Sequence, residues 1–128
     1  MQRVALVLLI IGALTSCSKK EDTQTEAATG DTYKLIEILA DIGNGTGTFQ
    51  PVTSSKTIEF KTNGTVVSNG ELCKMSEASS PATTGTYSFT DSTITSANCT
   101  NLPFKITGNH LIIFYPCIEP CQAKFEKR

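Results

Sequence analysis

The 128-residue sequence contains no tryptophan, a single histidine and only two methionines. It also lacks a run of lysine or arginine long enough to follow a phosphate backbone, and its net charge is only −1. This charge pattern excludes nucleic acid from the expected partners. After Tyr33, no window of about 11 residues keeps the helical repeat of apolar side chains, so a helical domain is also excluded.

The groups that an enzyme or a metal site needs are equally scarce. The only histidine, His110, follows a Gly108-Asn109 pair that is typical of a tight turn. The Cys-x2-Cys spacing of zinc sites is missing, and residues 41–47 resemble a calcium loop without its second carboxylate. Inward strand positions, derived below, carry no Asp, Lys or Arg, so no buried acid–base pair is expected. We therefore expect no catalytic activity, metal or cofactor.

The N-terminus has the pattern of an export signal. Arg3 precedes an apolar run of eleven residues, Val4 to Leu14, and then Thr15-Ser16-Cys17. Such a run is shorter than the roughly 20 residues that span a bilayer, and fits a signal peptide. A cysteine directly after small residues resembles the lipobox of bacterial lipoproteins. We therefore expect residues 1–16 to be removed and Cys17 to be lipidated, anchoring the protein to the outer membrane of a bacterial cell envelope, on either face.

The remaining chain divides into a tether and one domain. Residues 18–32 contain no large apolar side chain and are rich in Thr, Glu, Lys and Ala. Such a segment cannot bury enough apolar surface to fold. We therefore predict a flexible tether at 17–32, including the lipidated Cys17, and a single small domain at 33–128.

Short apolar runs rich in β-branched and aromatic residues follow Tyr33, punctuated by Gly, Asn and Asp, which is typical of β-strands. Two-residue hairpin turns are predicted at Asn63-Gly64, Asp91-Ser92 and Gly108-Asn109. The predicted strands span 33–39, 56–61, 65–69, 85–90, 93–97, 103–107, 110–115 and 122–127. Eight sequential antiparallel strands leave no exposed edge when they close, so we predict an up-and-down β-barrel, with a two-sheet β-sandwich as the alternative.

The three turns fix a register in which large apolar residues share one face. In this register Phe60 is opposite Val67, Phe89 is opposite Ile94, and Ile106 is opposite Leu111. The tight turns lie at one end of the barrel, and the longer loops at 40–55, 70–85, 97–102 and 116–121 lie at the other. Because function tends to reside on such loops, the long-loop end is the predicted mouth.

Several segments are similar to the lipocalin-like domain of small bacterial lipoproteins. The segments are Tyr33-Lys-Leu35, Gly47-Thr-Phe-Gln-Pro-Val52, Ile58-Glu-Phe60 before Asn63-Gly64-Thr65, Gly85-Thr-Tyr87, and Cys117 to Cys121 ahead of Lys124-Phe125. This resemblance implies an eight-stranded barrel that binds a small apolar molecule. Tyr33 stands where that family usually has a tryptophan.

Two hypotheses for the domain follow. In the first, the barrel binds a small hydrophobic ligand, lined mainly by Phe60, Val67, Tyr87, Phe89, Phe104, Ile106 and Phe125. In the second, the core is filled with side chains, and the protein is an interaction or structural module that contacts an envelope protein. The outward-facing apolar residues Ile112 and Phe114 favour such a contact.

Four cysteines besides Cys17 remain, an even number that indicates disulfides in an exported protein. Cys117 and Cys121 flank a strand reversal in which their Cα atoms can approach closely. Cys73 and Cys99 end strands that run to the long-loop end. We therefore predict the pairs Cys117–Cys121 and Cys73–Cys99.

Overall fold

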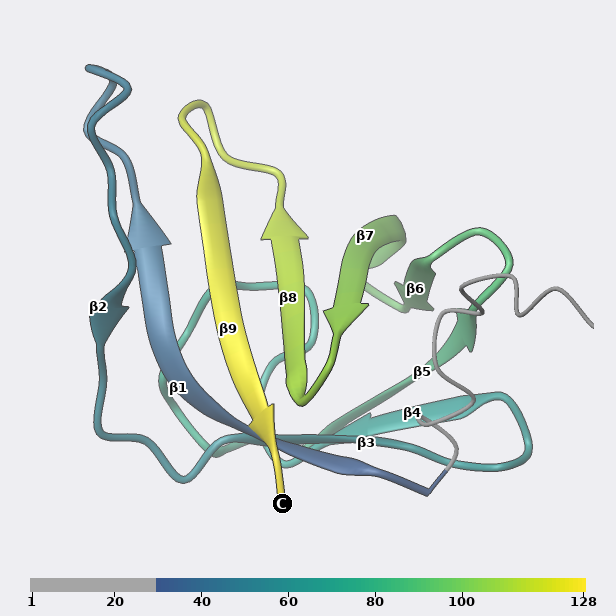
Figure 1. Cartoon of the computed structure of the whole chain (residues 1–128). Helices are drawn as coiled ribbons and strands as arrows, with labels where there is room; N and C mark the ends of the chain where they lie inside the picture. Colours follow the sequence, from purple (N-terminus) through teal and green to yellow (C-terminus); the bar gives the residue numbers. More distant parts are fainter. Residues whose placement is uncertain (1–29) are drawn as a thin grey trace, which may run out of the picture.

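The structure, a computed structural model, describes residues 30–128. The predicted signal peptide, the predicted lipidation site Cys17 and the part of the predicted tether before residue 30 lie outside the described residues. The described part is all-β, a closed antiparallel β-barrel of eight strands with one short extra strand (Figure 1). The barrel prediction is thus confirmed over the sandwich. Within residues 30–128, no helix is long and apolar enough to cross a membrane.

Apart from β2, which lies beside β1, the strands follow one another around the barrel in sequence order. They are β1 (Thr32–Ala40), β2 (Gln50–Pro51), β3 (Thr57–Phe60), β4 (Thr65–Ser68), β5 (Thr83–Ser88), β6 (Thr93–Ser96), β7 (Cys99–Thr107), β8 (His110–Tyr115) and β9 (Cys121–Lys127). Pairing of β1 with β9, from Tyr33↔Lys127 to Ala40↔Cys121, closes the barrel. This closure removes the exposed edges that an open sheet would leave along β1 and β9.

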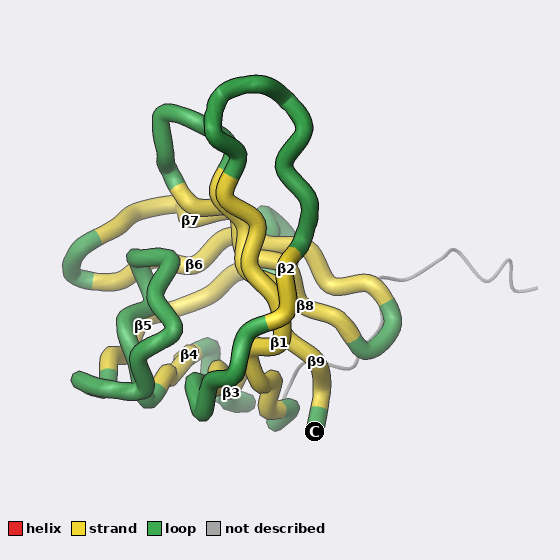
Figure 2. Tube along the Cα trace, turned by 90° about the vertical axis from the view of Figure 1, so that its left-hand side faces the viewer, coloured by secondary structure: helices red, strands yellow, loops and turns green. Residues whose placement is uncertain are grey.

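The short strand β2 is the one element that the sequence did not predict. The first half of β1 pairs with β3, as in Tyr33↔Ile58, whereas its second half pairs with β2, as in Glu37↔Pro51. The loop that connects β1 and β2 extends beyond the barrel (Figure 2). A two-residue strand that contains a proline has no alternating pattern to recognise.

The β7–β8 hairpin has the predicted register. Thr107 pairs with His110 across Gly108-Asn109, and Ile106 pairs with Leu111. Gly108 has a φ of +57°, which a glycine adopts without a steric penalty. Leu111 is fully buried, and the outward-facing Ile112 is half-buried, as predicted.

The predicted register of the β3–β4 hairpin is wrong by one residue. Phe60 pairs with Val66 rather than Val67, because the turn has three residues, 62–64, and the Lys61 N–H donates to the Thr65 carbonyl across it at 2.8 Å. Only Gly64 has a positive φ, +81°, whereas the predicted turn requires it at both central positions. Val66 therefore faces the core and is fully buried, and Val67 is half-buried on the outer face.

The β5–β6 hairpin also differs from the prediction. Tyr87, not Phe89, pairs with Ile94, and the connection runs from residue 89 to 92. The Ser88 hydroxyl accepts a hydrogen bond from the Asp91 N–H at 3.1 Å, which stabilises the wider turn. Phe89 is therefore a turn residue and remains partly exposed.

One hydrophobic core fills the barrel. Its fully buried members include Phe60 and Phe125, with Tyr33 and Leu35 contributed by β1. The β6–β7 connection, predicted as a loop over 97–102, is instead a two-residue turn, because β7 begins at Cys99. The connections β1–β2, β2–β3, β4–β5 and β8–β9 are the longer ones.

Candidate functional site

Four of the predicted ligand-binding residues meet in an aromatic cluster, defined as Phe60, Tyr87, Phe89 and Phe104, near the tight turns. The ring centroid of Phe60 lies 5.0 Å from that of Tyr87 and 5.4 Å from that of Phe104. Phe89 lies 4.7 Å from Tyr87. Because Phe60 is fully buried and packs against all three rings, the cluster is a filled part of the core.

The other three predicted ligand-binding residues, Val67, Ile106 and Phe125, do not belong to the aromatic cluster. Phe125 is fully buried and Ile106 is partly buried against the core. Val67 lies on the outer face of β4, for the register reason given above. Most of the predicted ligand-binding residues therefore lie on the inner face of the barrel, as predicted, but they pack against each other in the core.

A groove of about 300 Å³ lies elsewhere, in the barrel wall between β7 and β8 near the long-loop end. None of the side chains that line it carries a charge. The groove is lined by Cys99, Thr100, Asn101, Leu102, Pro103, Phe114, Tyr115 and Pro116. The sequence predicts Phe114 as an outward-facing apolar residue, but no sequence pattern indicates this groove.

The groove exists because β7 and β8 separate at Pro103. Their pairing runs from Thr107↔His110 to Phe104↔Ile113 and ends there. Proline has no N–H to donate, so the ladder of hydrogen bonds cannot continue through it. Asn101, with a φ of +53°, then adds an irregularity to β7, and its N–H donates to the Thr95 hydroxyl on β6. Pro103 is the sequence signal for the interrupted ladder, whereas the groove itself depends on the relative positions of β7 and β8.

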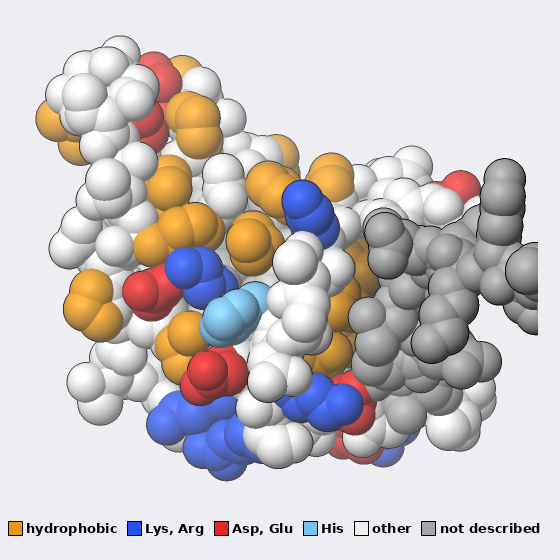
Figure 3. All heavy atoms as spheres, viewed as in Figure 1, with side chains coloured by type: hydrophobic (Ala, Val, Ile, Leu, Met, Phe, Trp, Pro, Cys, Tyr) orange, Lys and Arg blue, Asp and Glu red, His pale blue; other side chains and the backbone are white. Residues whose placement is uncertain are grey.

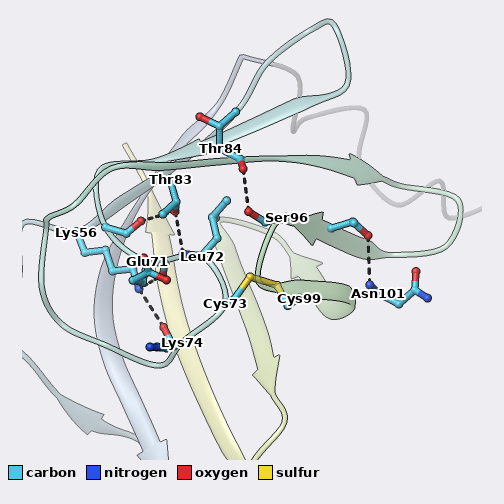
Figure 4. The surroundings of a disulfide bond; sticks show 12 residues. Lys56, Glu71, Leu72, Cys73, Lys74, Thr83, Thr84, Ser96, Cys99 and Asn101 are labelled. Carbon is cyan, nitrogen blue, oxygen red and sulfur yellow. Dashed lines mark hydrogen bonds between the residues drawn. A yellow bond between two sulfur atoms is a disulfide. The ribbon is translucent and has the colours of Figure 1, made fainter.

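Two disulfides hold the walls of this groove, and both have the predicted partners. Cys73–Cys99 has a Cα–Cα distance of 5.6 Å and links the start of β7 to the β4–β5 loop (Figure 4). Cys117–Cys121, with a Cα–Cα distance of 5.8 Å, closes the β8–β9 loop just after the end of β8. The disulfides therefore restrict the movement of both groove walls.

Lys56 contradicts the prediction that no inward position carries a charge. Its side chain is fully buried, and its ammonium group donates to the carbonyls of Glu71, Lys74 and Ser76 at 2.6, 3.3 and 3.0 Å (Figure 4). Burial lowers the pKa of Lys56 to about 8, although the nearby charge of Glu71 acts in the opposite direction. All three ammonium hydrogens are occupied, so Lys56 fixes the β4–β5 loop that carries Cys73.

Two other loops carry exposed isoleucines at the long-loop end of the barrel. Ile42, in the β1–β2 loop, and Ile118, in the β8–β9 loop, are both almost completely exposed. The Asp41 N–H donates to the Pro120 carbonyl at 3.1 Å, which joins the two loops (Figure 1). Asp41 and Glu119 are the charged residues of these loops, so the loop tips combine apolar side chains with an acidic character.

The Asp41 carboxylate orders the β1–β2 loop. It accepts hydrogen bonds from the N–H groups of Gly43, Asn44, Gly45 and Gly47 at 2.8 to 3.2 Å. Desolvation acts to raise the pKa of Asp41, but these four bonds outweigh it and hold the pKa below its usual range. The resemblance to a calcium loop thus has a local explanation.

The outer face of β1, β8 and β9 combines apolar side chains with ion pairs (Figure 3). Lys124 pairs with Glu37, and its ammonium lies 4.1 Å from the ring centroid of Phe49. His110 lies 3.8 Å from Glu126, and both side chains are about half exposed. An exposed contact such as that of His110 with Glu126 contributes little to stability, and this face forms no enclosed site.

Two tyrosine hydroxyls are buried without a hydrogen-bond partner among the described residues, those of Tyr33 and Tyr115. Burial raises the pKa of both groups, and the charge of Asp31 adds to the effect at Tyr33. An unpaired buried hydroxyl costs about 1–3 kcal/mol. Tyr115 is notable because it also lines the β7–β8 groove.

No group of three or more His, Cys, Asp or Glu side chains able to hold a metal ion is found within residues 30–128. Comparison with protein-family models, with curated proteins and with solved structures gave no match to this chain.

Proposed function

We propose that this protein is a lipid-anchored lipoprotein of the bacterial cell envelope whose lipocalin-like barrel binds a small apolar ligand. The groove between β7 and β8 is the observation that carries the ligand proposal. Its volume of about 300 Å³ is at the lower end of the range for small-molecule sites. Its lining is uncharged and its two walls are held by disulfides. The aromatic cluster serves as packing in this proposal.

The anchor proposal rests on the Thr15-Ser16-Cys17 pattern. The described chain begins at Gly30, whose N–H donates to the Phe60 carbonyl at 2.5 Å, beside the tight turns. A coil of the length of residues 17–29 spans about 20 Å on average. An anchor at Cys17 would therefore hold the tight-turn end towards the bilayer, and the groove would face away from it.

The anchor is tested by Cys17→Ser, which should abolish acylation and release the protein from the membrane fraction. Full retention and normal processing of this variant would contradict the anchor. This test is independent of ligand binding, which can be measured on the soluble domain.

For the ligand, mass spectrometry of lipophilic molecules that co-purify with the domain is the first measurement. Binding of the neutral dye Nile red is the second, in the parent and in Thr100→Trp, which places a large ring in the groove. Thr86→Trp, at an exposed position on β5 away from the groove, is the matched control. We expect Thr100→Trp to lose binding and Thr86→Trp to keep it. Absence of binding by the parent, or equal binding by the two variants, would contradict a ligand in the groove.

A second candidate function, an envelope interaction module, is favoured by Ile42 and Ile118. Exposed apolar residues on ordered loops are typical of partner surfaces. Asp41 and Glu119 beside them would complement a protein whose apolar site is bordered by Lys or Arg. If this is the function, Ile42→Ser with Ile118→Ser should abolish in-cell cross-linking from these loops without changing Nile red binding.

A further inference from the structure

We propose that the β7–β8 groove selects neutral apolar molecules that carry a hydroxyl or amide N–H, and that the backbone carbonyl of Phe114 accepts this hydrogen bond. The inference rests on the proposed ligand-binding function and specifies the chemical class of the ligand. Two features of the groove carry it: the hydrogen-bonding capacity left free at Pro103, and the absence of charge in the lining.

The free hydrogen-bonding capacity of the Phe114 carbonyl follows from the register of β7 and β8. In an antiparallel pair, directly opposite residues alternate between hydrogen-bonded and non-bonded pairs. Thr107 and His110 flank the two-residue turn and form a bonded pair, and Lys105↔Ile112 is the next. The third bonded pair would join Pro103 and Phe114. Pro103 has no N–H, so the Phe114 carbonyl faces β7 without the donor that another residue would supply there.

Two prolines lower the number of backbone N–H donors in the groove. Pro103 and Pro116, two of its lining residues, contribute carbonyls but no N–H groups. The Asn101 N–H is already used, since it donates to the Thr95 hydroxyl at 3.2 Å. A ligand that brings its own donor therefore fits these walls.

The lining also argues against a fatty acid in its ionised form. None of the lining residues is Lys, Arg or His. A carboxylate in this groove would lose hydration without gaining a cationic partner, which is unfavourable. An alcohol or a primary amide of the same chain length avoids this penalty. The expected ligands are thus long-chain alcohols, sterol-like alcohols or apolar amides.

The first experiment measures displacement of Nile red by a fatty alcohol, its primary amide, its methyl ester and its carboxylate, all of equal chain length, at pH 8. The alcohol and the amide should bind about 3- to 10-fold more tightly than the ester, which has no donor. The carboxylate should bind more weakly than the alcohol. Equal binding of alcohol and ester, or preferred binding of the carboxylate, would overturn the inference while leaving an apolar ligand in place. If neither Nile red nor any of these lipids binds, the proposed ligand-binding function fails as well.

The second experiment uses Pro103→Ala, which introduces a backbone N–H opposite the Phe114 carbonyl. This N–H would satisfy the carbonyl, so the alcohol and the ester should bind equally well to the variant. Pro120→Ala, in the β8–β9 loop and outside the groove lining, is the matched control and should keep the preference. A preference that is unchanged in Pro103→Ala would overturn the role of the Phe114 carbonyl. Thermal unfolding of both variants checks that the barrel remains folded.

Discussion

The two ends of the barrel are ordered by different interactions. At the tight-turn end, connections of two to four residues follow directly from strand pairing, and the aromatic cluster fills the space between the strands. At the long-loop end, order comes from separate links: two disulfides, the buried ammonium of Lys56 and the carboxylate of Asp41.

The difference between the two ends shows where a small barrel can form a groove. Short turns leave the side chains of neighbouring strands in contact, so the tight-turn end packs to a full core. Long loops would fluctuate if only strand pairing held them. Because local links hold them instead, the strands β7 and β8 can separate at Pro103 and leave a stable groove.

The largest expected effect of a single substitution is at the tight-turn end. Phe60→Ala should lower the free energy of unfolding by about 3–5 kcal/mol, because it leaves a cavity among the surrounding rings. Phe89→Ala is the control within the same cluster, and it should have a smaller effect because Phe89 is 37% exposed. Urea unfolding monitored by circular dichroism measures both. A small loss for Phe60→Ala would indicate an open pocket there instead of a filled core.

The next effect concerns the disulfides of the long-loop end. Replacing Cys73 and Cys99 by Ser should cost about 3.5 kcal/mol, and replacing Cys117 and Cys121 about 2 kcal/mol, on the chain-entropy relation. The first pair closes a loop with a sequence separation of 26, and the second of only 4. Chemical unfolding of the two double variants tests whether the Cys73–Cys99 disulfide stabilises the protein more than the Cys117–Cys121 disulfide. Both should also weaken ligand binding, because each removes a support of one groove wall.

Lys56 gives the long-loop end a pH dependence. Burial lowers its pKa from 10.5 to about 8 in the folded protein. Below about pH 8, the amine is charged in both the folded and the unfolded chain, and its contribution is constant. Between about pH 8 and 10.5, the folded protein has released a proton that the unfolded chain still holds, so stability rises with pH.

The test compares the free energy of unfolding of the parent with that of Lys56→Met across this range. The parent should gain stability relative to the variant as the pH rises from 8 towards 10.5. The free energy of unfolding of the parent could instead fall relative to that of the variant as the pH rises. This result would mean that the three carbonyls around Lys56 stabilise the charged amine more than burial destabilises it.

The smallest expected effect is local, at Asp41. Asp41→Ala removes the acceptor shared by four N–H groups of the β1–β2 loop. Amide hydrogen exchange of Gly43 and Gly45 should accelerate at neutral pH, while the midpoint of global unfolding stays nearly the same. In the parent, the same protection should be lost in acid only below the usual pKa of an aspartate, because these bonds lower the pKa of Asp41. Unchanged exchange in the variant would contradict this role.

The hairpins show how far local sequence predicts a register. Gly108-Asn109 forms the predicted two-residue turn, and the register of Ile106↔Leu111 follows. Asn63-Gly64 has the same composition but belongs to a three-residue turn, 62–64, so the partner of Phe60 shifts from Val67 to Val66. A shift of one residue exchanges the two faces of a strand, and the dipeptide alone does not determine which turn forms.

Lys56 illustrates a signal that was present but not used. It has the same parity along the strand as Ile58 and Phe60, both of which are fully buried, so alternation places it inward. An inward lysine is tolerated only where acceptors surround its ammonium group. Those acceptors come from Glu71, Lys74 and Ser76, which are distant in sequence.

The sequence by itself determined the closed eight-stranded barrel, its antiparallel order and the two cysteine pairs, because alternation, turn residues and cysteine positions are local signals. Tertiary structure alone decided which aromatic residues pack together, how Lys56 is satisfied, and where a groove remains. These outcomes depend on the meeting of distant segments. Pro103 becomes the end of a ladder only because Phe114 lies opposite it, and a space between two strands is a property of their relative positions and not of either segment.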